Sequence, residues 1–369
     1  MSHEISRIIM SERIGILTSG GDCPGLNAVI RAVAKAASIR GWETVGFFGG
    51  YEGLLEPVKV RTLKYEELGG LLTRGGTILG TSNRGRFAAK IGHGETQRIP
   101  LEILDAAKAT FQKHNLRALI CIGGDGSLSI AQQLYEHGIP VIGVPKTIDN
   151  DLEATSTTFG FDSAVACATD ALDRLHTTAE SHDRIMVLEV MGRYAGWIAI
   201  YSGVAGGADV ILIPEIPFNY DSMCAKIQQR EAQGKRFTLV VVAEGAREKD
   251  GGFVTSGAQQ ANREARLGGI GFAVATELEK RTGKETRVCV LGHLQRGGSP
   301  TNFDRALCSM FGAEAVQLIA AGQYGNMVAY IGGQLGFVKI TEAIGRLKTV
   351  SPGGNLARTA RALGICLGD

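Results

Sequence analysis

Short apolar runs rich in β-branched residues recur along the chain and alternate with longer segments of helical periodicity. Each run has four to eight apolar residues and ends at Gly or Pro, which is typical of strands buried in parallel sheets. The runs are RIGILT at 13–18, TVGFFGG at 44–50, ALICIGG at 118–124, VIGVP at 141–145, RIMVLEVMG at 184–192, VILIP at 210–214, TLVVVAEG at 238–245 and RVCVLGH at 287–293. We expect eight parallel strands there.

Between these runs, residues 26–40 carry apolar side chains at the spacing of one helical face, and residues 162–178 and 265–281 repeat that pattern. Alternation of strands and helices predicts an α/β fold with helices on both faces of largely parallel sheets. A chain of 369 residues is long for a single core and favours two domains. Since no linker is evident, we expect the chain to cross between the domains more than once.

Three stretches interrupt this rhythm. Residues 83–97 and 248–258 are polar or Gly-rich and are predicted to be inserted loops. Residues 315–338 carry no charge and are long enough to span a bilayer, but Gln, Asn and Gly break their apolar character. A buried helix followed by a turn is the better interpretation.

Composition excludes several classes of protein. The net charge of +2 gives no argument for a nucleic-acid or anionic-membrane partner. The seven cysteines are scattered and include no CxxC pair, which disfavours zinc and thioredoxin chemistry and favours a reducing compartment. The first twelve residues lack the apolar core of a signal peptide. We therefore expect a soluble cytoplasmic protein.

Two glycine-rich turns follow predicted strands and could hold phosphate. The first contains Gly20 and Gly21; a strand, a tight turn and a helix present free N–H groups to an anion, although a turn that serves packing alone is equally compatible. The second, Gly123-Gly124-Asp125-Gly126-Ser127, lets the backbone approach a polyphosphate while Asp125 binds its Mg²⁺. The alternative is that Asp125 only caps the following helix.

A third turn concentrates reactive groups, because Lys146, Thr147, Asp149 and Asp151 lie within six residues. Two carboxylates at i and i+2 of an extended segment point the same way, and such crowding raises the pKa of one of them. That suits a general base. A solvated acidic turn is the alternative.

A basic set of residues is suited to a phosphorylated substrate. We place its members beyond the carboxyl ends of strands, where open α/β sheets bind ligands. The planar fork of Arg makes bidentate bonds to phosphate. A single surface Arg is usually only solvated, so the inference depends on the set. The set is Arg184, Arg193, Arg287, His293 and Arg296.

The ordered motifs LTSGGDCPGLN, GGDGS, PKTIDND, LEVMGRYAGW and VLGHLQRGGSP resemble those of the phosphofructokinase family, over residues from about 13 to just beyond 304. GGDG alone is shared with other kinases, whereas TIDND and GHLQRGGSP together are specific. The resemblance implies two doubly wound, Rossmann-like domains with the active site in the cleft between them. The implied domains are 1–160 plus about 295–345 for the nucleotide, and 161–294 plus about 346–369 for the sugar phosphate.

The resemblance also implies a reaction and a role for each matching residue. The reaction is phosphoryl transfer from Mg-ATP to the 1-hydroxyl of fructose 6-phosphate, in a homo-oligomer (dimer or tetramer) whose sites are shared between subunits. Asp149 would be the base, supported by Thr147 and Asp151, and Asp125 would hold Mg²⁺. The nucleotide would be held by Gly21, Arg84, Gly85, Gly124, Asp125, Gly126 and Ser127, with Arg86 as a competing match for Arg84. The sugar and its phosphates would be held by Met191, Gly192, Arg193, Glu244, His293 and Arg296, joined by Arg184 and Arg287 of a neighbouring subunit.

The phosphoryl donor depends on two positions. In this family Asp at the position of Gly126 accompanies pyrophosphate use, so Gly126 favours ATP; Lys146 resembles the pyrophosphate users. We expect ATP, with pyrophosphate as the alternative. A Rossmann-type oxidoreductase is disfavoured because no GxGxxG motif with a downstream ribose-binding acid is present, and a non-catalytic regulatory subunit because Asp125 and Asp149 are both retained.

Overall fold

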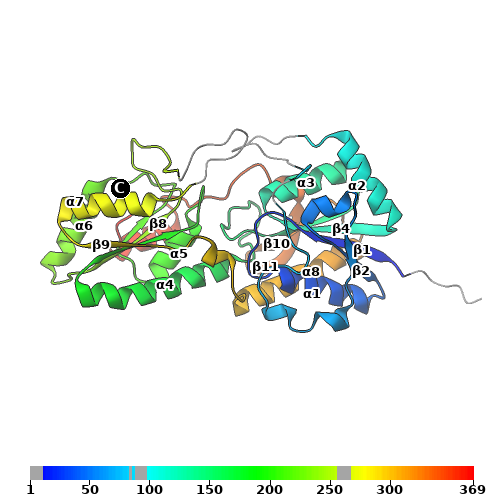
Figure 1. The fold of residues 1–369 in the computed structure, drawn as a ribbon, viewed down its shortest axis with the longest axis horizontal. Helices are drawn as coiled ribbons and strands as arrows, with labels where there is room; N and C mark the ends of the chain where they lie inside the picture. Colours follow the sequence, from blue (N-terminus) through cyan, green and yellow to red (C-terminus); the bar gives the residue numbers. More distant parts are fainter. Residues whose placement is uncertain (1–10, 83–84, 88–97, 256–266) are drawn as a thin grey trace, which may run out of the picture.

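Seven strands form the larger of two sheets (Figure 1). The structure is a computed structural model that describes residues 11–82, 85–87, 98–255 and 267–369. The strand order is β11-β10-β5-β4-β1-β2-β3, parallel except for β3 and β11 at the two edges. The strands are β1 (Arg13–Thr18), β2 (Glu43–Phe47), β3 (Val60–Thr62), β4 (Leu116–Gly123), β5 (Val141–Pro145), β10 (Asn326–Ile331) and β11 (Gln334–Lys339).

The smaller sheet is wholly parallel, in the order β7-β8-β6-β9. Its strands are β6 (Ile185–Val190), β7 (Val210–Leu212), β8 (Thr238–Ala243) and β9 (Thr286–Val290). All eight strands predicted from the sequence are therefore present, and the prediction of an α/β protein with largely parallel sheets is confirmed.

Helices cover both faces of each sheet (Figure 1). On the larger sheet, α1 and α8 pack together on one face and α2 and α3 on the other; on the smaller sheet, α4 and α5 lie opposite α6 and α7. The helices are α1 (Leu26–Ile39), α2 (Leu101–Lys113), α3 (Asp125–Glu136), α4 (Phe161–His182), α5 (Trp197–Ala205), α6 (Tyr220–Ala232), α7 (Ile270–Thr282), α8 (Asn302–Ala320), α9 (Ile340–Ala343) and α10 (Asn355–Ala362). Short 3₁₀ helices are η1 (Gly50–Leu54), η2 (Tyr65–Leu68), η3 (Leu71–Thr73) and η4 (Gly292–Arg296).

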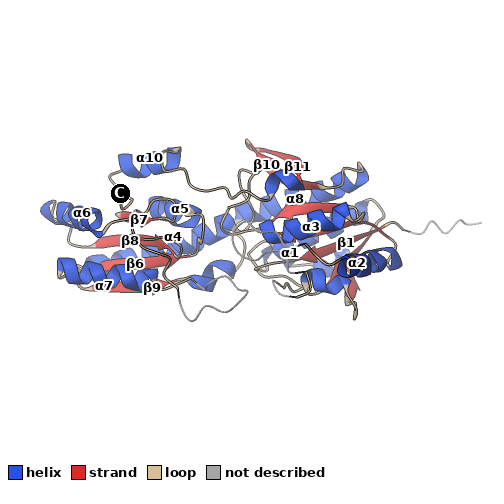
Figure 2. Cartoon of the chain, turned by 90° about the horizontal axis from the view of Figure 1, so that it is seen from above, coloured by secondary structure: helices blue, strands red, loops and turns tan. Residues whose placement is uncertain are grey.

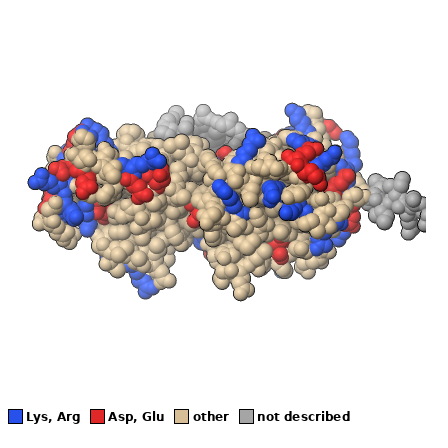
Figure 3. Space-filling view, turned by 90° about the horizontal axis from the view of Figure 1, so that it is seen from below, with Lys and Arg blue, Asp and Glu red and all other residues tan. Residues whose placement is uncertain are grey.

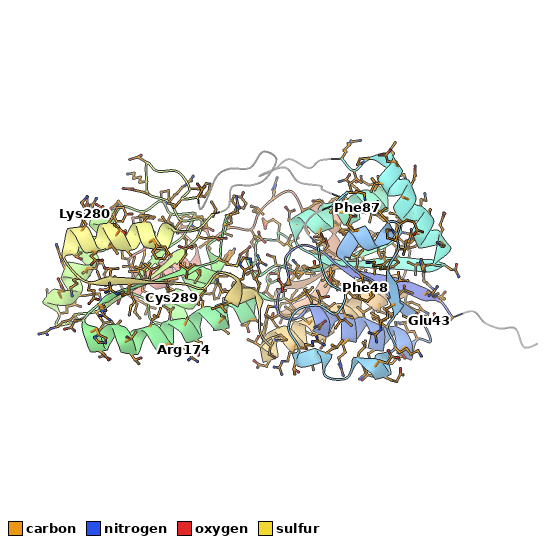
Figure 4. All side chains as sticks on the ribbon, viewed as in Figure 1. Glu43, Phe48, Phe87, Arg174, Lys280 and Cys289 are labelled. Atoms are coloured by element: carbon orange, nitrogen blue, oxygen red, sulfur yellow. The ribbon has the colours of Figure 1, made fainter. Side chains whose placement is uncertain are left out.

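The helical periodicity of the sequence is explained by burial. Val29, Ile30 and Val33 of α1 are fully buried in the same core as Phe311 of α8 and Ile16 of β1. The outer face of α4 is polar by contrast: Arg174 points away from the sheet and pairs with Asp170 one turn earlier (Figure 4). On the face seen in Figure 3, positive and negative side chains are interspersed on both lobes, as the small net charge leads one to expect.

The chain passes between the two lobes three times. It enters the lobe of the smaller sheet with α4, returns with α8, and crosses again after α9 to end beside β7, where Ile211 N–H bonds to Cys366 O (Figure 2). The domain boundaries given above stay a prediction.

Several elements differ from those predicted. Within 315–338 the helix ends at Ala320, and the rest forms the β10–β11 hairpin, whose half-exposed edge strand β11 lacks a continuous apolar pattern. Helix α7 begins only at Ile270, because Gly268 and Gly269 adopt positive φ angles. Of the two predicted loops, 248–255 contains only isolated bridges, and 83–84, 88–97 and 256–258 lie outside the described residues. Within the described part of the chain, no helix is both long and apolar enough to cross a membrane.

Candidate active site

The carboxyl ends of strands from both sheets meet at one place. Arg296, in η4 just after β9, donates a 3.1 Å hydrogen bond to the carbonyl oxygen of Asp22, just after β1. Residues that follow β4, β5, β6 and β8 gather at the same edges. Ligands of open α/β sheets bind beyond such strand ends, so this junction is the candidate site.

The turn after β1 lies between two cations. A Cβ added at Gly20 would lie 3.3 Å from Lys146 Nζ, and one added at Gly21 would lie 2.8 Å from Arg296 Nη1. Gly20 also has a φ of 83°, a conformation that L side chains rarely adopt. Glycine at position 20 is therefore favoured by its backbone conformation, and glycine at both positions leaves room for the two cations to approach the turn.

The turn after β4 leads directly into α3. Gly124 is the N-cap residue and Asp125 is the first helical residue, so the alternative that Asp125 only caps the helix is wrong. One carboxylate oxygen of Asp125 accepts a 3.3 Å hydrogen bond from Gly345 N–H. Gly126 and Ser127 complete the first turn, whose free N–H groups and positive dipole favour an anion. No group of three or more potential metal ligands gathers among the residues that the structure describes.

Asp149 has a shielded carboxyl group. Its Oδ1 is buried and accepts no hydrogen bond from any described residue. The pKa of Asp149 is raised to about 7: burial is the main cause, the neighbouring Asp151 and Glu244 also raise the pKa, and Arg296 and Lys146 oppose the rise. The alternative of a solvated acidic turn is therefore wrong for Asp149.

The loop that carries Asp149 is anchored on both sides. The backbone N–H of Asp149 donates to Thr147 Oγ1 at 3.1 Å, and Thr158 Oγ1 donates to Thr147 O at 2.6 Å. Asn150, between the two aspartates, adopts a left-handed conformation with φ 51°. These contacts fix the direction in which Asp149 points.

The smaller sheet contributes Met191, Gly192, Arg193 and Glu244. Gly192 has φ 133°, and a Cβ there would lie 2.8 Å from Ala195 O. The loop after β6 touches the loop after β8, where Gly245 N–H bonds to Gly192 O at 3.1 Å. Burial raises the pKa of Glu244, whereas the nearby Arg193 lowers it. Arg193 and Glu244 are thus close enough at this junction for the guanidinium to influence the carboxyl group electrostatically.

Arg184 and Arg287 are not at this junction, and their predicted place beyond carboxyl strand ends is wrong. Arg184 precedes β6 and Arg287 is the second residue of β9, so both lie at the amino-terminal edge of the smaller sheet. Both pair with Glu285, Arg184 at 2.8 Å. By contrast His293 and Arg296 do follow β9, His293 being exposed and Arg296 partly buried.

Of the segment around Arg84, the predicted nucleotide-binding arginine, the structure describes residues 85–87. Arg84 lies outside the described residues, and Gly85 follows it beside Glu52. Arg86, the competing match, pairs with Glu52 at 3.0 Å.

Sequence reasoning missed three residues that support the site. Buried Gln295 bridges the loops after β6 and β9, accepting from Met191 N–H at 3.4 Å and donating to Gly292 O at 3.1 Å. The left-handed turn at Asn150 could have been found, since Asn tolerates that conformation best after Gly. Lys348 contacts Asn150. No sequence motif indicated this contact, because the two residues are far apart in the sequence.

Comparison with known proteins agrees with this geometry. The family model described as Phosphofructokinase matches residues 13–319. The chain is 54% identical over 358 residues to the ATP-dependent 6-phosphofructokinase of Chloroflexus aggregans, covering 97% of this chain and 98% of that protein. The structure of phosphofructokinase from Saccharomyces cerevisiae is similar with a TM-score of 0.76 and 30% identity, over 90% of this chain and 45% of the yeast chain. A pyrophosphate-dependent phosphofructokinase from Nitrosospira multiformis shares the fold (TM-score 0.79, 22% identity, 97% of this chain and 93% of that chain). The chain belongs to the phosphofructokinase family.

Proposed function

We propose that the protein transfers the terminal phosphoryl group of ATP to the 1-hydroxyl of fructose 6-phosphate, the glycolytic reaction that forms fructose 1,6-bisphosphate. The observation that carries this proposal is the buried Oδ1 of Asp149, near enough to the cations Lys146 and Arg296 for both to lower its pKa, where strand ends of both sheets meet. A base with a pKa near the working pH suits removal of the hydroxyl proton, and fixed cations suit the charge of the moving group. The relatives named ATP-dependent 6-phosphofructokinase support the same reaction.

The larger sheet binds the nucleotide. The glycine turns at Gly21 and Gly124 and the start of α3, with Gly126 and Ser127, accept its phosphates. By resemblance to the family, Arg84 and Gly85 also contribute to nucleotide binding. Asp125 holds Mg²⁺, which in such sites is bound by one or two carboxylates together with substrate phosphates. When bound, the ion supplies charge neutralisation on the phosphates.

The smaller sheet binds the sugar phosphate. Glu244 bonds the sugar hydroxyls, Met191 and Gly192 line the sugar, and Arg193 lies at the transferring group, while Thr147 and Asp151 support Asp149. His293 and Arg296 hold the 6-phosphate. Arg184 and Arg287, which lie at the far edge of their own sheet, reach the site of a neighbouring subunit in a homo-oligomer.

The donor is ATP because Gly126 leaves room for the rest of the nucleotide beyond the transferred group. A coupled assay with fructose 6-phosphate and either donor tests this directly, and we expect turnover with ATP to exceed turnover with pyrophosphate by about tenfold or more. Gly126→Asp should abolish ATP use by charge and bulk, whereas the control Gly126→Ala should retain it. Faster turnover with pyrophosphate than with ATP would overturn the donor assignment.

A further inference from the structure

Lys348 lies between α9 and α10. The segment that leads to α10 crosses from one lobe to the other (Figure 2). Lys348 is beyond residues 13–319, which the family model matches. Its partly buried side chain reaches the loop that carries Asp149, although the two residues are far apart in the sequence.

The ammonium group of Lys348 donates three hydrogen bonds. It donates to Asn150 Oδ1 at 2.8 Å, to Thr155 O at 2.9 Å and to Ser156 O at 3.0 Å. A lysine ammonium has three protons, so each has an acceptor. The cation thereby joins both ends of the segment 150–156.

The main chain of Lys348 is fixed between the two lobes. Its N–H donates to Asp151 O at 2.9 Å, and its carbonyl accepts from Trp197 Nε1 at 2.8 Å. Trp197 begins α5, immediately after the loop that carries Arg193. Leu347 also forms a bridge with Leu152. The backbone of Lys348 is therefore held by residues of both lobes, and this fixes the position from which its side chain extends.

The contact with Asn150 matters because Asn150 separates the two aspartates. Its left-handed conformation is uncommon for a residue with a side chain and persists only where its surroundings hold it. The same Oδ1 that accepts from Lys348 also accepts from Thr158 N–H at 3.1 Å. If these bonds were lost, the turn could relax, and Asp149 would point elsewhere.

We propose that Lys348 is a positioning residue for Asp149: its three hydrogen bonds hold the Asn150 turn that aims the base at the sugar hydroxyl. The inference rests on the proposed function, since it assigns Lys348 to the phosphoryl transfer in which Asp149 takes the proton. Lys348 acts through the loop and does not itself touch the substrate.

Steady-state kinetics with fructose 6-phosphate and Mg-ATP test this in three variants of the full chain. Lys348→Met keeps the length and apolar stem but removes the donors; we expect kcat to fall about tenfold or more, with both KM values within about threefold of wild type. Lys348→Arg keeps charge and donors and should recover several times the turnover of the Met variant. Lys339→Met, an exposed lysine at the end of β11, is the matched control and should be unchanged.

A double-mutant cycle separates positioning from general destabilisation. Asn150→Gly permits the same backbone conformation but removes the acceptor, so it should lower kcat as Lys348→Met does, and the double variant should be no worse than the poorer single variant. If Lys348→Met does not fold, the proposal is tested with Asn150→Gly alone. A kcat of Asn150→Gly equal to that of the wild-type enzyme overturns the proposal. Turnover of Lys348→Met within about twofold of wild type, or additive losses, also overturns it. A wild-type protein without activity would instead refute the proposed function.

Discussion

The ammonium of Lys146, the residue after β5, donates a 2.6 Å hydrogen bond to the carbonyl oxygen of Gly21 in the turn after β1. Lys146 is only 4% exposed, and burial lowers its pKa. The bond ties the turn predicted to hold phosphate to the loop that carries Asp149. One buried cation thus links the proposed nucleotide-binding turn to the loop of the proposed base.

Replacing Lys146 with Met should keep the packing and remove both the charge and this bond. We expect turnover with ATP to fall by roughly 10–100-fold, because a cation beside the transferring phosphoryl is lost. Pyrophosphate use should not appear, since Gly126 is unchanged. Kinetics with both donors provide the measurement, and a switch of donor in this variant would show that Lys146 rather than Gly126 governs the choice.

The pH dependence of kcat/KM should report the raised pKa of Asp149. Only the ionised carboxylate can accept a proton, so activity should fall as pH drops below about 7 and reach a plateau above it. Lys146 lowers the pKa of Asp149, so in Lys146→Met this acid limb should move to higher pH. An acid limb near pH 4, the usual value for Asp, would mean that Asp149 is solvated in the free enzyme.

Arg184 and Arg287 provide a test of shared sites. Hybrids made from Arg184→Ala and Asp149→Asn subunits should regain activity, because some sites then combine an intact base with intact arginines from the neighbour. Hybrids of Arg184→Ala with Arg287→Ala are the control and should stay inactive, since every shared site lacks one arginine. Hybrids of the first pair that form but remain inactive would mean that each subunit builds its own site.

Asp304 of α8 should be important for stability. It is fully buried and accepts hydrogen bonds from Gly160 N–H at 3.0 Å, Ser163 N–H at 2.9 Å and Ser163 Oγ at 2.6 Å, at the start of α4. Asp304→Ala leaves these donors unpaired and should lower the free energy of unfolding by about 2–5 kcal/mol.

Urea denaturation measures that loss. Asp170→Ala removes the exposed pair with Arg174 on the same α4 helix and should leave the free energy of unfolding nearly unchanged. Equal effects of the two substitutions would contradict the role assigned to Asp304.

The sequence predicted elements well where one physical signal dominates. β4 and β5 are continuous buried runs, and both lead into the glycine or acidic turns that were singled out. The β10–β11 hairpin was missed because β11 is a half-exposed edge strand with glycine at its centre. The alternation of apolar and polar residues does not reveal such a strand.

The candidate site was predicted residue by residue only where a motif follows a strand. Asp149, Arg193 and Arg296 follow β5, β6 and β9, as the motifs predicted, and their roles stay a prediction. Arg184 was misplaced because it begins its apolar run instead of ending it. Lys348 could not be predicted, since its contact with Asn150 exists only after the chain has crossed between lobes three times.

Turnover of Asp149→Asn tests the central claim most directly, since Asn keeps the shape of the side chain and cannot take the proton. We predict that kcat falls by roughly 10²–10⁴-fold while KM for fructose 6-phosphate and for ATP stays within about threefold. Asp221→Asn, at an exposed carboxylate on α6, is the control and should keep full activity. An Asp149→Asn enzyme that retains more than about a tenth of wild-type turnover would contradict the assignment of Asp149 as the base.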